Sequence, residues 1–352
     1  MALPDTDVRQ EASGEAGRPR SRRRTYAVAI YAVALALYWV FLGLPTDPMV
    51  AVLWLWLATI AWNSERPWRH HLQFARDWMP IVALLVVYDF SRGFADNLSA
   101  PHVTEMIDGD RLLFGGELPT VWLQEHFYDP AHAHWWDLIA AWIYFSHFVA
   151  SFTVAVVLWL RRRALWAAFM RRWFALTAAG LTTYFLYPAA PPWWASEQGY
   201  IAEHVERMSS RGWEVIGLNT AGKLLNVGQA MSNPVAAMPS LHSAFALLVV
   251  AFFFNRVRKR WLPLLIAYPI AMATTLAYTG EHYIVDALVG WAYVGLVFLF
   301  VGLGELWWQD RRERQVFAAA QAVAARRIDT MPAAEAVSVP AGSAAHPDDQ
   351  RR

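Results

Sequence analysis

The chain has 352 residues, of which 57% are apolar and only 17% are charged, and it contains no cysteine. Soluble domains carry about a quarter charged residues, so the composition excludes a disordered chain and disfavours an ordinary soluble domain. The lack of cysteine excludes disulfide scaffolds, zinc–thiolate sites and thiolate nucleophiles. The 30 Lys and Arg against 29 Asp and Glu give a net charge of +1, which as a total indicates no class of partner.

Eight stretches of the chain contain no Asp, Glu, Lys or Arg. They are Tyr26–Leu44, Pro48–Trp62, Trp78–Tyr88, Leu138–Leu160, Trp173–Ser196, Leu224–Asn255, Trp261–Gly280 and Ala287–Gly304. A bilayer core takes about 20 helical residues, and most of these stretches are long enough. The alternative, a soluble all-α protein with buried core helices, is disfavoured because such helices are usually shorter. The sequence therefore predicts an all-α integral membrane protein with about eight transmembrane helices.

The positive charges divide unevenly between the two sides of these predicted spans. One side holds 25 of the 30 Lys and Arg residues, and the other holds only Arg92, Arg111, Arg207, Arg211 and Lys223. The positive-inside rule then predicts a multi-pass cell-membrane protein with both termini in the cytoplasm. The long loops at about residues 90–137 and 189–239 would lie outside.

The predicted spans divide the chain into three parts. Residues 1–24 are expected to form a flexible cytoplasmic N-terminus, and residues 25–304 a polytopic membrane catalytic domain. Residues 305–352 are expected to form a cytoplasmic helix, about Glu305–Arg327, followed by a disordered tail.

Ionisable residues inside or at the ends of membrane spans are costly and therefore candidates for function. His282 and Asp286 are four positions apart at the start of the eighth predicted span, a spacing that stacks two side chains on one helix face. A carboxylate beside one imidazole nitrogen fixes the tautomer and leaves the other nitrogen with a lone pair. This arrangement suits a histidine nucleophile, although a purely structural pair would have the same spacing.

A second candidate is the run Met238-Pro239-Ser240-Leu241-His242-Ser243. Proline is favoured in the first turn of a helix and serine at its cap, so the run predicts the start of the sixth span. The free N–H groups at a helix N-terminus attract phosphate. His242 in that turn would suit a general acid that protonates a leaving oxygen.

These two motifs together resemble the type 2 phosphatidic acid phosphatase superfamily, and in particular its branch containing the inositol phosphorylceramide synthases. The likeness covers roughly residues 180–300 and is weaker at residues 88–93. It implies a six-helix phosphatase-like core at about residues 78–304, preceded by two extra N-terminal spans. It also implies that His282 attacks phosphorus, Asp286 orients and activates it, and His242 protonates the departing alkoxide, with no metal or cofactor.

The chain departs from the superfamily pattern at several positions. The motif K-x6-R-P is absent, Leu241 stands where P-S-G-H has glycine, and Thr275 and Leu276 replace the Ser-Arg of S-R-x5-H-x3-D. The usual phosphate-binding cations are therefore missing. This mildly favours the synthase branch over the phosphatases.

A phosphoryl transition state still requires positive charge. Arg92 is the first candidate, because it ends a predicted span at the right depth and can bind phosphate with two parallel hydrogen bonds; an ion pair with Asp89 is an equal alternative. Ser240 and Lys223 are the other predicted phosphate-binding residues. Arg207 and Arg211 lie in the same outer loop as Lys223. Any of the three could close over the substrate, although solvated loop charge is the commoner role.

Other histidines admit metal binding or proton relay. His132 and His134 with Asp137, or His242 and His282 with Asp286, have the residue types of a metal site, but an H-x-H in a polar loop is mostly incidental. His147 lies in mid-span, where a hydrogen-bonded core histidine is the simpler reading and a relay the alternative. We expect no metal and no cofactor.

The sequence thus predicts a lipid phosphatase or phosphotransferase, similar to an inositolphosphotransferase, that works at the extracytoplasmic face through a phosphohistidine. Its expected partners are an amphiphilic phosphate ester, the bilayer and a polyol or lipid hydroxyl acceptor, with no nucleic acid. One alternative is a proton- or ion-coupled transporter, since intramembrane His and Asp also serve relays. Another is a catalytically silent lipid-binding protein.

Overall fold

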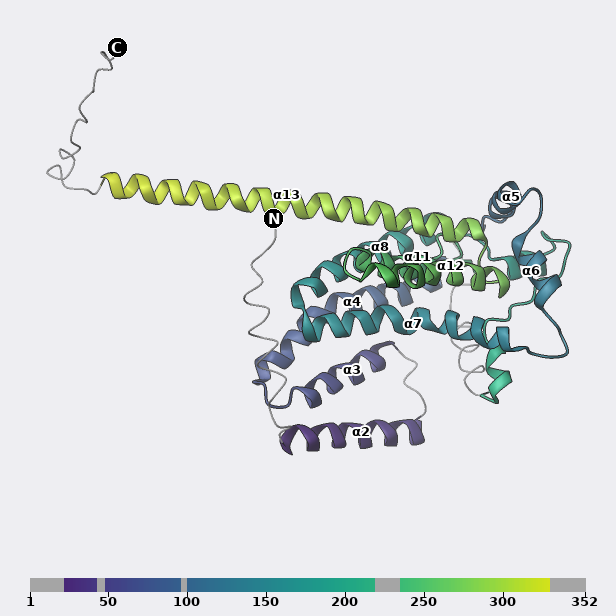
Figure 1. The fold of residues 1–352 in the computed structure, drawn as a ribbon, viewed down its shortest axis with the longest axis horizontal. Coiled ribbons are helices and arrows are strands. Elements are labelled where there is room, and N and C mark those ends of the chain that lie inside the picture. Colours follow the sequence, from purple (N-terminus) through teal and green to yellow (C-terminus); the bar gives the residue numbers. More distant parts are fainter. Residues whose placement is uncertain (1–21, 43–47, 96–99, 219–234, 330–352) are drawn as a thin grey trace, which may run out of the picture. The chain divides into compact units, whose positions relative to one another are not determined.

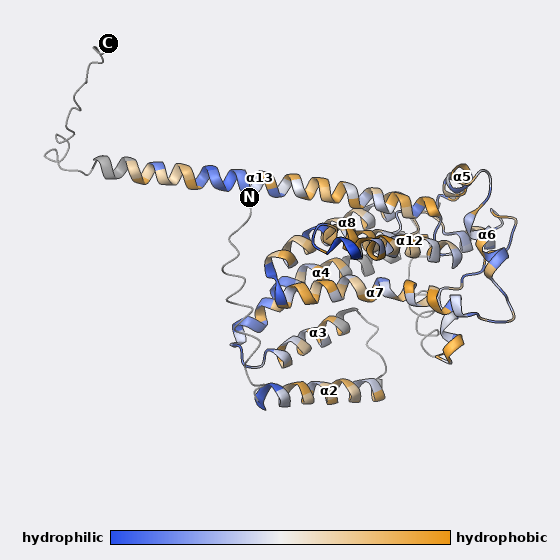
Figure 2. Cartoon of the chain, in the orientation of Figure 1, coloured by the Kyte–Doolittle hydropathy of each residue, from blue (hydrophilic) through white to orange (hydrophobic). Residues whose placement is uncertain are grey.

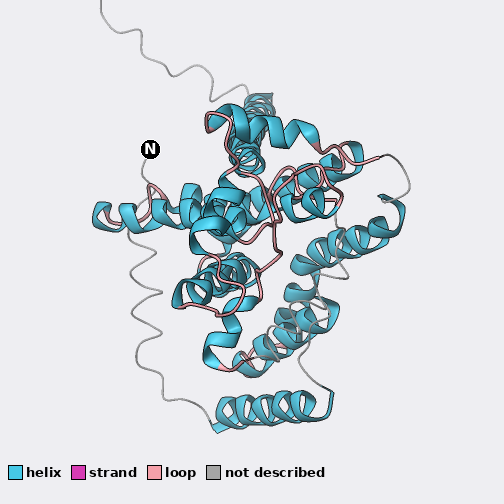
Figure 3. Cartoon of the chain, turned by 90° about the vertical axis from the view of Figure 1, so that its right-hand side faces the viewer, coloured by secondary structure: helices cyan, strands magenta, loops and turns pink. Residues whose placement is uncertain are grey.

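A computed structural model describes residues 22–42, 48–95, 100–218 and 235–329. Within these residues every regular element is a helix, as Figure 3 shows, and β structure is limited to isolated bridges. The all-α prediction is confirmed for this part of the chain.

The elements follow one another in the order labelled in Figure 1. They are α2 (Arg22–Leu42), α3 (Pro48–Trp62), α4 (Trp68–Ala95), α5 (Thr104–Leu113), α6 (Pro119–Phe127), α7 (Trp135–Arg161), α8 (Arg163–Leu186), α9 (Pro192–Glu197), η1 (Arg211–Ile216), α11 (Leu241–Phe253), η2 (Lys259–Trp261), α12 (Leu262–Tyr278) and α13 (Ile284–Asp329).

Each of the eight charge-free stretches overlaps at least one of these helices, but not all of the helices have the length of a span. Four helical segments are long and apolar enough to cross a bilayer, namely Arg22–Phe41, Trp135–Arg161, Lys259–Tyr278 and Ile284–Ala324. Shorter apolar segments lie in α3 and α11, and Figure 2 shows the apolar character of all these helices. The helix composition is that of a multi-pass membrane protein, while the count of eight spans remains a prediction.

Two helix ends agree with the prediction, and proline lies at both. The helix in the sixth stretch begins at Leu241, directly after Pro239 and Ser240, and α8 ends at Leu186, close to the predicted start of the outer loop at about residue 189. Pro188 follows that end closely, and proline disfavours helix in the residue before it. The segment 219–234 lies outside the described residues.

The N-terminal end of the described chain differs from the prediction, whereas the helix predicted at about Glu305–Arg327 is present. Helix α2 already begins at Arg22, so Arg22, Arg23 and Arg24 are helical instead of belonging to a flexible N-terminus. Helix α13 continues past Gly304 to Asp329, through the polar residues that are blue in Figure 2. The remaining tail residues lie outside the described part.

Helix α11 is the centre of the bundle that carries the site. It packs against α7, α8 and α12, while α4 packs against α8 and α3, and α3 against α2. Backbone hydrogen bonds join the loop after α8 to the segment before α11, as in Ala189 N to Val235 O (2.8 Å), and the segment before η1 to the turn before α13, as in Met208 N to Thr279 O (3.2 Å). We call this region the loop end of the bundle.

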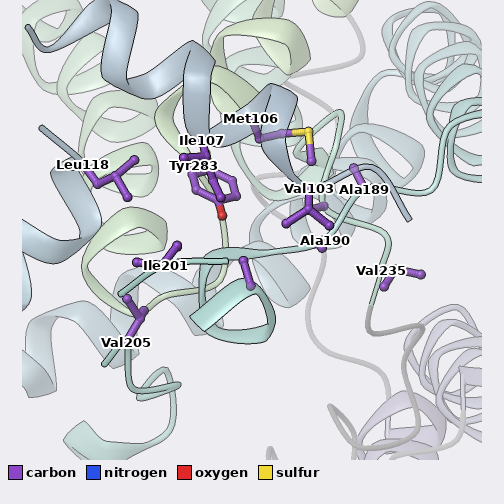
Figure 4. Close-up of a cluster of buried hydrophobic side chains, with 12 residues drawn as sticks. Val103, Met106, Ile107, Leu118, Ala189, Ala190, Ile201, Val205, Val235 and Tyr283 are labelled. Atoms are coloured by element: carbon purple, nitrogen blue, oxygen red, sulfur yellow. The ribbon is translucent and has the colours of Figure 1, made fainter. Parts of the chain in front are cut away.

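A compact apolar cluster, the loop core, fills the loop end (Figure 4). It consists of Val103, Met106, Ile107, Leu118, Ala189, Ala190, Ala195, Ile201, Val205, Val235, Ala237 and Tyr283. Its burial stabilises the loops as a packed layer, and through Tyr283 that layer is anchored directly beside His282.

Candidate active site

The turn before α11 is fixed by its neighbours. Ser240 is the N-cap of α11, and its hydroxyl accepts a hydrogen bond from Ser243 N at 3.4 Å. The Tyr184 hydroxyl donates to Pro239 O at 2.8 Å. The predicted Pro-Ser helix start is therefore present, and the Ser240 hydroxyl, fully buried, serves as a cap.

Two glycines let neighbouring helices approach this turn. A Cβ on Gly180 of α8 would lie 2.7 Å from Leu241 Cδ2, and one on Gly290 of α13 would lie 2.6 Å from Ser240 O. Leu241, the departure from P-S-G-H, is thus accommodated by the glycine opposite it. The close approach brings α13 and the motif of His282 onto α11.

His282 does not lie on the predicted helix face, because α13 begins only at Ile284. Asp286 is in the first turn of α13, where its Oδ2 accepts from Tyr283 N at 2.9 Å, as an acidic residue at the third helical position often does. Ser240 N donates to the Asp286 backbone carbonyl at 3.0 Å. His282 and Asp286 are therefore close because Asp286 caps the start of α13 and His282 lies just before that helix, not because both lie on one helix face.

Asp110 of α5 completes this helix start. Its carboxylate accepts from Ile284 N at 3.0 Å and from Val285 N at 2.8 Å, so it satisfies two first-turn donors that would otherwise lack partners. Burial raises the pKa of Asp110 to about 6, against the lowering effect of these two hydrogen bonds. Sequence analysis missed this residue, since it lies more than 170 positions from its partners.

The three residues expected to carry the chemistry meet at this point. His282 Nε2 lies 3.3 Å from His242 Nδ1, and His282 Nδ1 lies 3.5 Å from Asp286 Oδ2. The second distance is within ion-pair range but too long for a strong hydrogen bond, as is common in catalytic groups without substrate. His282 and Asp286 are both buried.

Aromatic rings enclose His242 on its other side. Tyr144 stacks on it at 5.1 Å between ring centroids, and His147 lies at 4.1 Å. His147 Nδ1 and His242 Nε2 are both buried, and neither has a hydrogen-bond partner among the described residues. His147 therefore lies beside the site in the bundle interior. Within the described residues its Nδ1 does not form the hydrogen bond expected of a core histidine, and a role as a proton relay stays a prediction.

A charged pair lies next to the candidate nucleophile. Arg207 donates from Nε and Nη2 to the two carboxylate oxygens of Glu281, at 3.0 and 3.1 Å. Ser209 Oγ donates to Glu281 Oε1 at 2.7 Å, and Arg207 also stacks over Trp193 at 4.7 Å. The sequence named Arg207 only as a minor candidate, and nothing local in the sequence predicts its pairing with Glu281.

The other predicted cations are placed as follows. Arg92 belongs to the last turn of α4, with its side chain outside the described part, and Lys223 also lies outside the described residues. Arg211 lies over the Tyr128 ring at 4.6 Å and donates to Asp129 O. Phosphate binding by Arg92, Ser240 and Lys223 stays a prediction.

His134 and Asp137 have structural roles, whereas the His132 side chain is exposed. Asp137 Oδ2 accepts from His134 N at 2.7 Å, which caps α7, and Asp137 Oδ1 accepts from the Tyr278 hydroxyl at 2.6 Å. Within the described residues no group of three His, Cys, Asp or Glu side chains has the arrangement of a metal site.

A family model and two curated proteins resemble this chain over part of its length. A family model described as PAP2 superfamily matches residues 115–300. The inositol phosphorylceramide synthase catalytic subunit AUR1 of Saccharomyces cerevisiae is 27% identical over 240 residues, which is 65% of this chain and 56% of that protein. The phosphoinositol dihydroceramide synthase of Bacteroides thetaiotaomicron is 33% identical over 135 residues, which is 36% of this chain and 42% of that protein.

This chain thus spans about half the length of these two relatives. No solved structure matches it significantly. The matched family range includes both histidines and Asp286 and exceeds half of the chain, so the chain belongs to the PAP2 superfamily, as its motifs predicted.

Proposed function

We propose that this protein is a membrane phosphotransferase that moves a phosphorylated head group between lipids through a phosphohistidine on His282. The observation that carries the proposal is the placement of His282, with Nε2 facing His242 and Nδ1 facing Asp286. Family membership supports the same assignment.

In the first step, the lone pair of His282 Nε2 attacks the phosphorus of a phosphate ester. The bond from phosphorus to the ester oxygen breaks, and the departing alkoxide takes a proton from His242. Asp286 stabilises the positive charge that develops on the His282 ring. The products are an alcohol and a phosphohistidine.

In the second step, the acceptor hydroxyl gives its proton to His242 and its oxygen attacks phosphorus. The phosphorus–nitrogen bond breaks and His282 returns to its starting state. Water as acceptor makes the protein a phosphatase, and a lipid hydroxyl makes it a transferase. The two similar proteins are named as synthases of inositol phosphorylceramide and phosphoinositol dihydroceramide, which favours transfer of an inositol phosphate group to a lipid hydroxyl.

The spacing of the histidines sets a condition on substrate binding. Attack places phosphorus about 3 to 3.5 Å from the nucleophile, whereas the two nitrogens are themselves only 3.3 Å apart. The substrate must therefore separate the rings or enter beside them. The N-terminus of α11, with its positive dipole end, offers a place for the phosphate oxygens.

The test uses the full-length protein, purified in detergent, with an inositol phospholipid labelled at phosphorus. We expect an acid-labile phosphoprotein and label transfer that requires an added lipid hydroxyl. His282→Ala should abolish both, while His132→Ala, a change at an exposed loop histidine, should leave both intact. Normal transfer by the His282 variant would refute the proposal. Gradient-dependent flux without chemical change would instead support the transporter.

We further propose that the loop end faces outward and that both termini are cytoplasmic. The natural chain has no cysteine, so a single introduced cysteine can be labelled without background. His132→Cys should react with an impermeant thiol reagent in intact cells, and Arg314→Cys should react only after lysis. The reverse pattern would show the opposite orientation.

A further inference from the structure

We propose that Arg207 is the residue that binds the substrate phosphate, and that Glu281 holds it in place for that purpose. This inference rests on the proposed function, because that reaction needs a cation beside His282. The family cations are missing from the motifs of this chain, so the required charge must come from another position.

The segment that carries Arg207 is built onto the backbone that precedes His282. Gln124 Nε2 donates to both Glu206 O and Tyr278 O at 2.9 Å, and its Oε1 accepts from Glu206 N at 2.9 Å. Gly280 has a φ of +74°, and a Cβ there would lie 2.8 Å from Glu206 O. The chain around Arg207 is therefore packed against residues 278–280, which precede His282, and is not a solvated loop.

The guanidinium itself is held in one orientation. Its Nε and Nη2 are bound by Glu281, whose side chain is only 8% exposed, and one face is stacked on Trp193. A guanidinium has five N–H donors, and this contact uses two of them. Among the described residues Nη1 has no protein acceptor, and the Arg207 side chain remains 27% exposed, so a ligand can reach the remaining donors.

The position of Arg207 relative to the histidines fits a phosphate ligand. Glu281 is the residue before His282, and it holds the Arg207 guanidinium through two hydrogen bonds. A phosphate attacked by His282 would thus lie near a fixed cation with free N–H groups, which is the arrangement that bidentate phosphate binding uses.

A simpler role for Arg207 is to neutralise the buried Glu281 carboxylate. Paired variants separate the two roles. Arg207→Gln removes the cationic partner of Glu281 and should lower the free energy of unfolding in either case. The double variant Arg207→Gln with Glu281→Gln removes both charges. If Arg207 only neutralises Glu281, the double variant should bind phosphate as tightly as the wild type.

The experiment measures the dissociation constant of inorganic phosphate and of orthovanadate from the rise in unfolding temperature of the purified full-length protein. Loss of a charged hydrogen-bond donor predicts phosphate binding about 10- to 100-fold weaker in both the Arg207 variant and the double variant. Arg207→Lys should be intermediate. The matched control is Arg211→Gln, four residues further along, whose guanidinium contacts Tyr128 and Asp129.

Wild-type phosphate affinity in the double variant would overturn the inference, and so would an equal loss in Arg211→Gln. Phosphate binding does not require turnover, so His282→Ala should retain Arg207-dependent binding. If every lipid assay shows no transfer while this binding persists, the proposed function fails and the phosphate site stands.

Discussion

His282 and His242 approach each other to 3.3 Å, yet their surroundings have opposite character. His282 follows Glu281 and faces Asp286, and its backbone N donates to Leu276 O of α12 at 3.3 Å. His242 is packed among the rings of Tyr144 and His147, and in the described part of the chain no carboxylate contacts it.

The difference matches two different chemical tasks. A nucleophilic imidazole becomes positively charged when its bond to phosphorus forms, and a neighbouring carboxylate stabilises that charge. A general acid must instead release its proton to the leaving oxygen, and an anionic partner would hold the proton back. The surroundings therefore support His282 as nucleophile and His242 as acid.

The largest expected effect comes from removing the charge beside His282. Asp286→Asn should lower kcat on the order of 10⁴-fold, as expected when a histidine loses its orienting carboxylate. The amide oxygen can still accept from Tyr283 N, so the unfolding temperature should change little. The measurement is steady-state transfer together with thermal unfolding, and a kcat within tenfold of the wild type would contradict the assigned role.

The second change tests the other histidine. His242→Gln should slow transfer from a lipid alcohol by about 10²- to 10⁴-fold, the usual contribution of a general acid. With a nitrophenol ester of the same phosphorylated head group, the first-turnover release of nitrophenolate should slow by less than about tenfold, because nitrophenolate leaves without a proton and its release precedes the second step. Equal losses with both leaving groups would show that His242 does not act as the acid.

These two histidines could be identified from the sequence because their signals are local. The charge-free stretches predict membrane helices, and Pro-Ser before Leu241 predicts a helix start. The contacts of Asp110 with Ile284 and of Arg207 with Glu281 join residues 174 and 74 positions apart. Such pairs depend on the path of the loops, which no local pattern specifies.

Helix length was likewise only partly predictable. The absence of charge between residues 224 and 255 does not by itself locate the start of a helix, whereas Pro239 and Ser240 do, and α11 begins directly after them at Leu241. His282 lies outside its helix because Asp286 is used as a cap. The spacing of four therefore identified His282 and Asp286 as neighbours, but they meet through the cap of α13 and not on one helix face.

The pH dependence of stability tests the hydrogen bonds by which Asp110 holds the start of α13, next to His282. The pKa of Asp110 is raised to about 6 in the folded protein, above its ordinary value near 4, so the folded state binds this proton more tightly than the unfolded chain. Through Asp110, stability should therefore rise by up to about 3 kcal/mol as the pH falls from 7 to 4.

Asp110→Asn should remove that contribution, so that the difference in unfolding free energy between wild type and variant changes across this window. Unfolding at several pH values in one detergent measures it. A difference that is constant from pH 7 to pH 4 would mean that Asp110 does not bind a proton on folding.

The smallest expected effect concerns the contact between Gly290 of α13 and Ser240 at the start of α11, which brings His282 and His242 together. A Cβ at Gly290 would lie 2.6 Å from Ser240 O, whereas nothing lies within 4 Å of one at Gly295 in the same helix. Gly290→Ala should therefore cost about 1–3 kcal/mol of stability, while Gly295→Ala should be neutral or gain up to about 1 kcal/mol. Because the clash pushes α13 from the start of α11, Gly290→Ala should also lower kcat, and Gly295→Ala should not. Equal effects of the two changes on kcat would mean that the 3.3 Å spacing of the histidines does not depend on this helix contact.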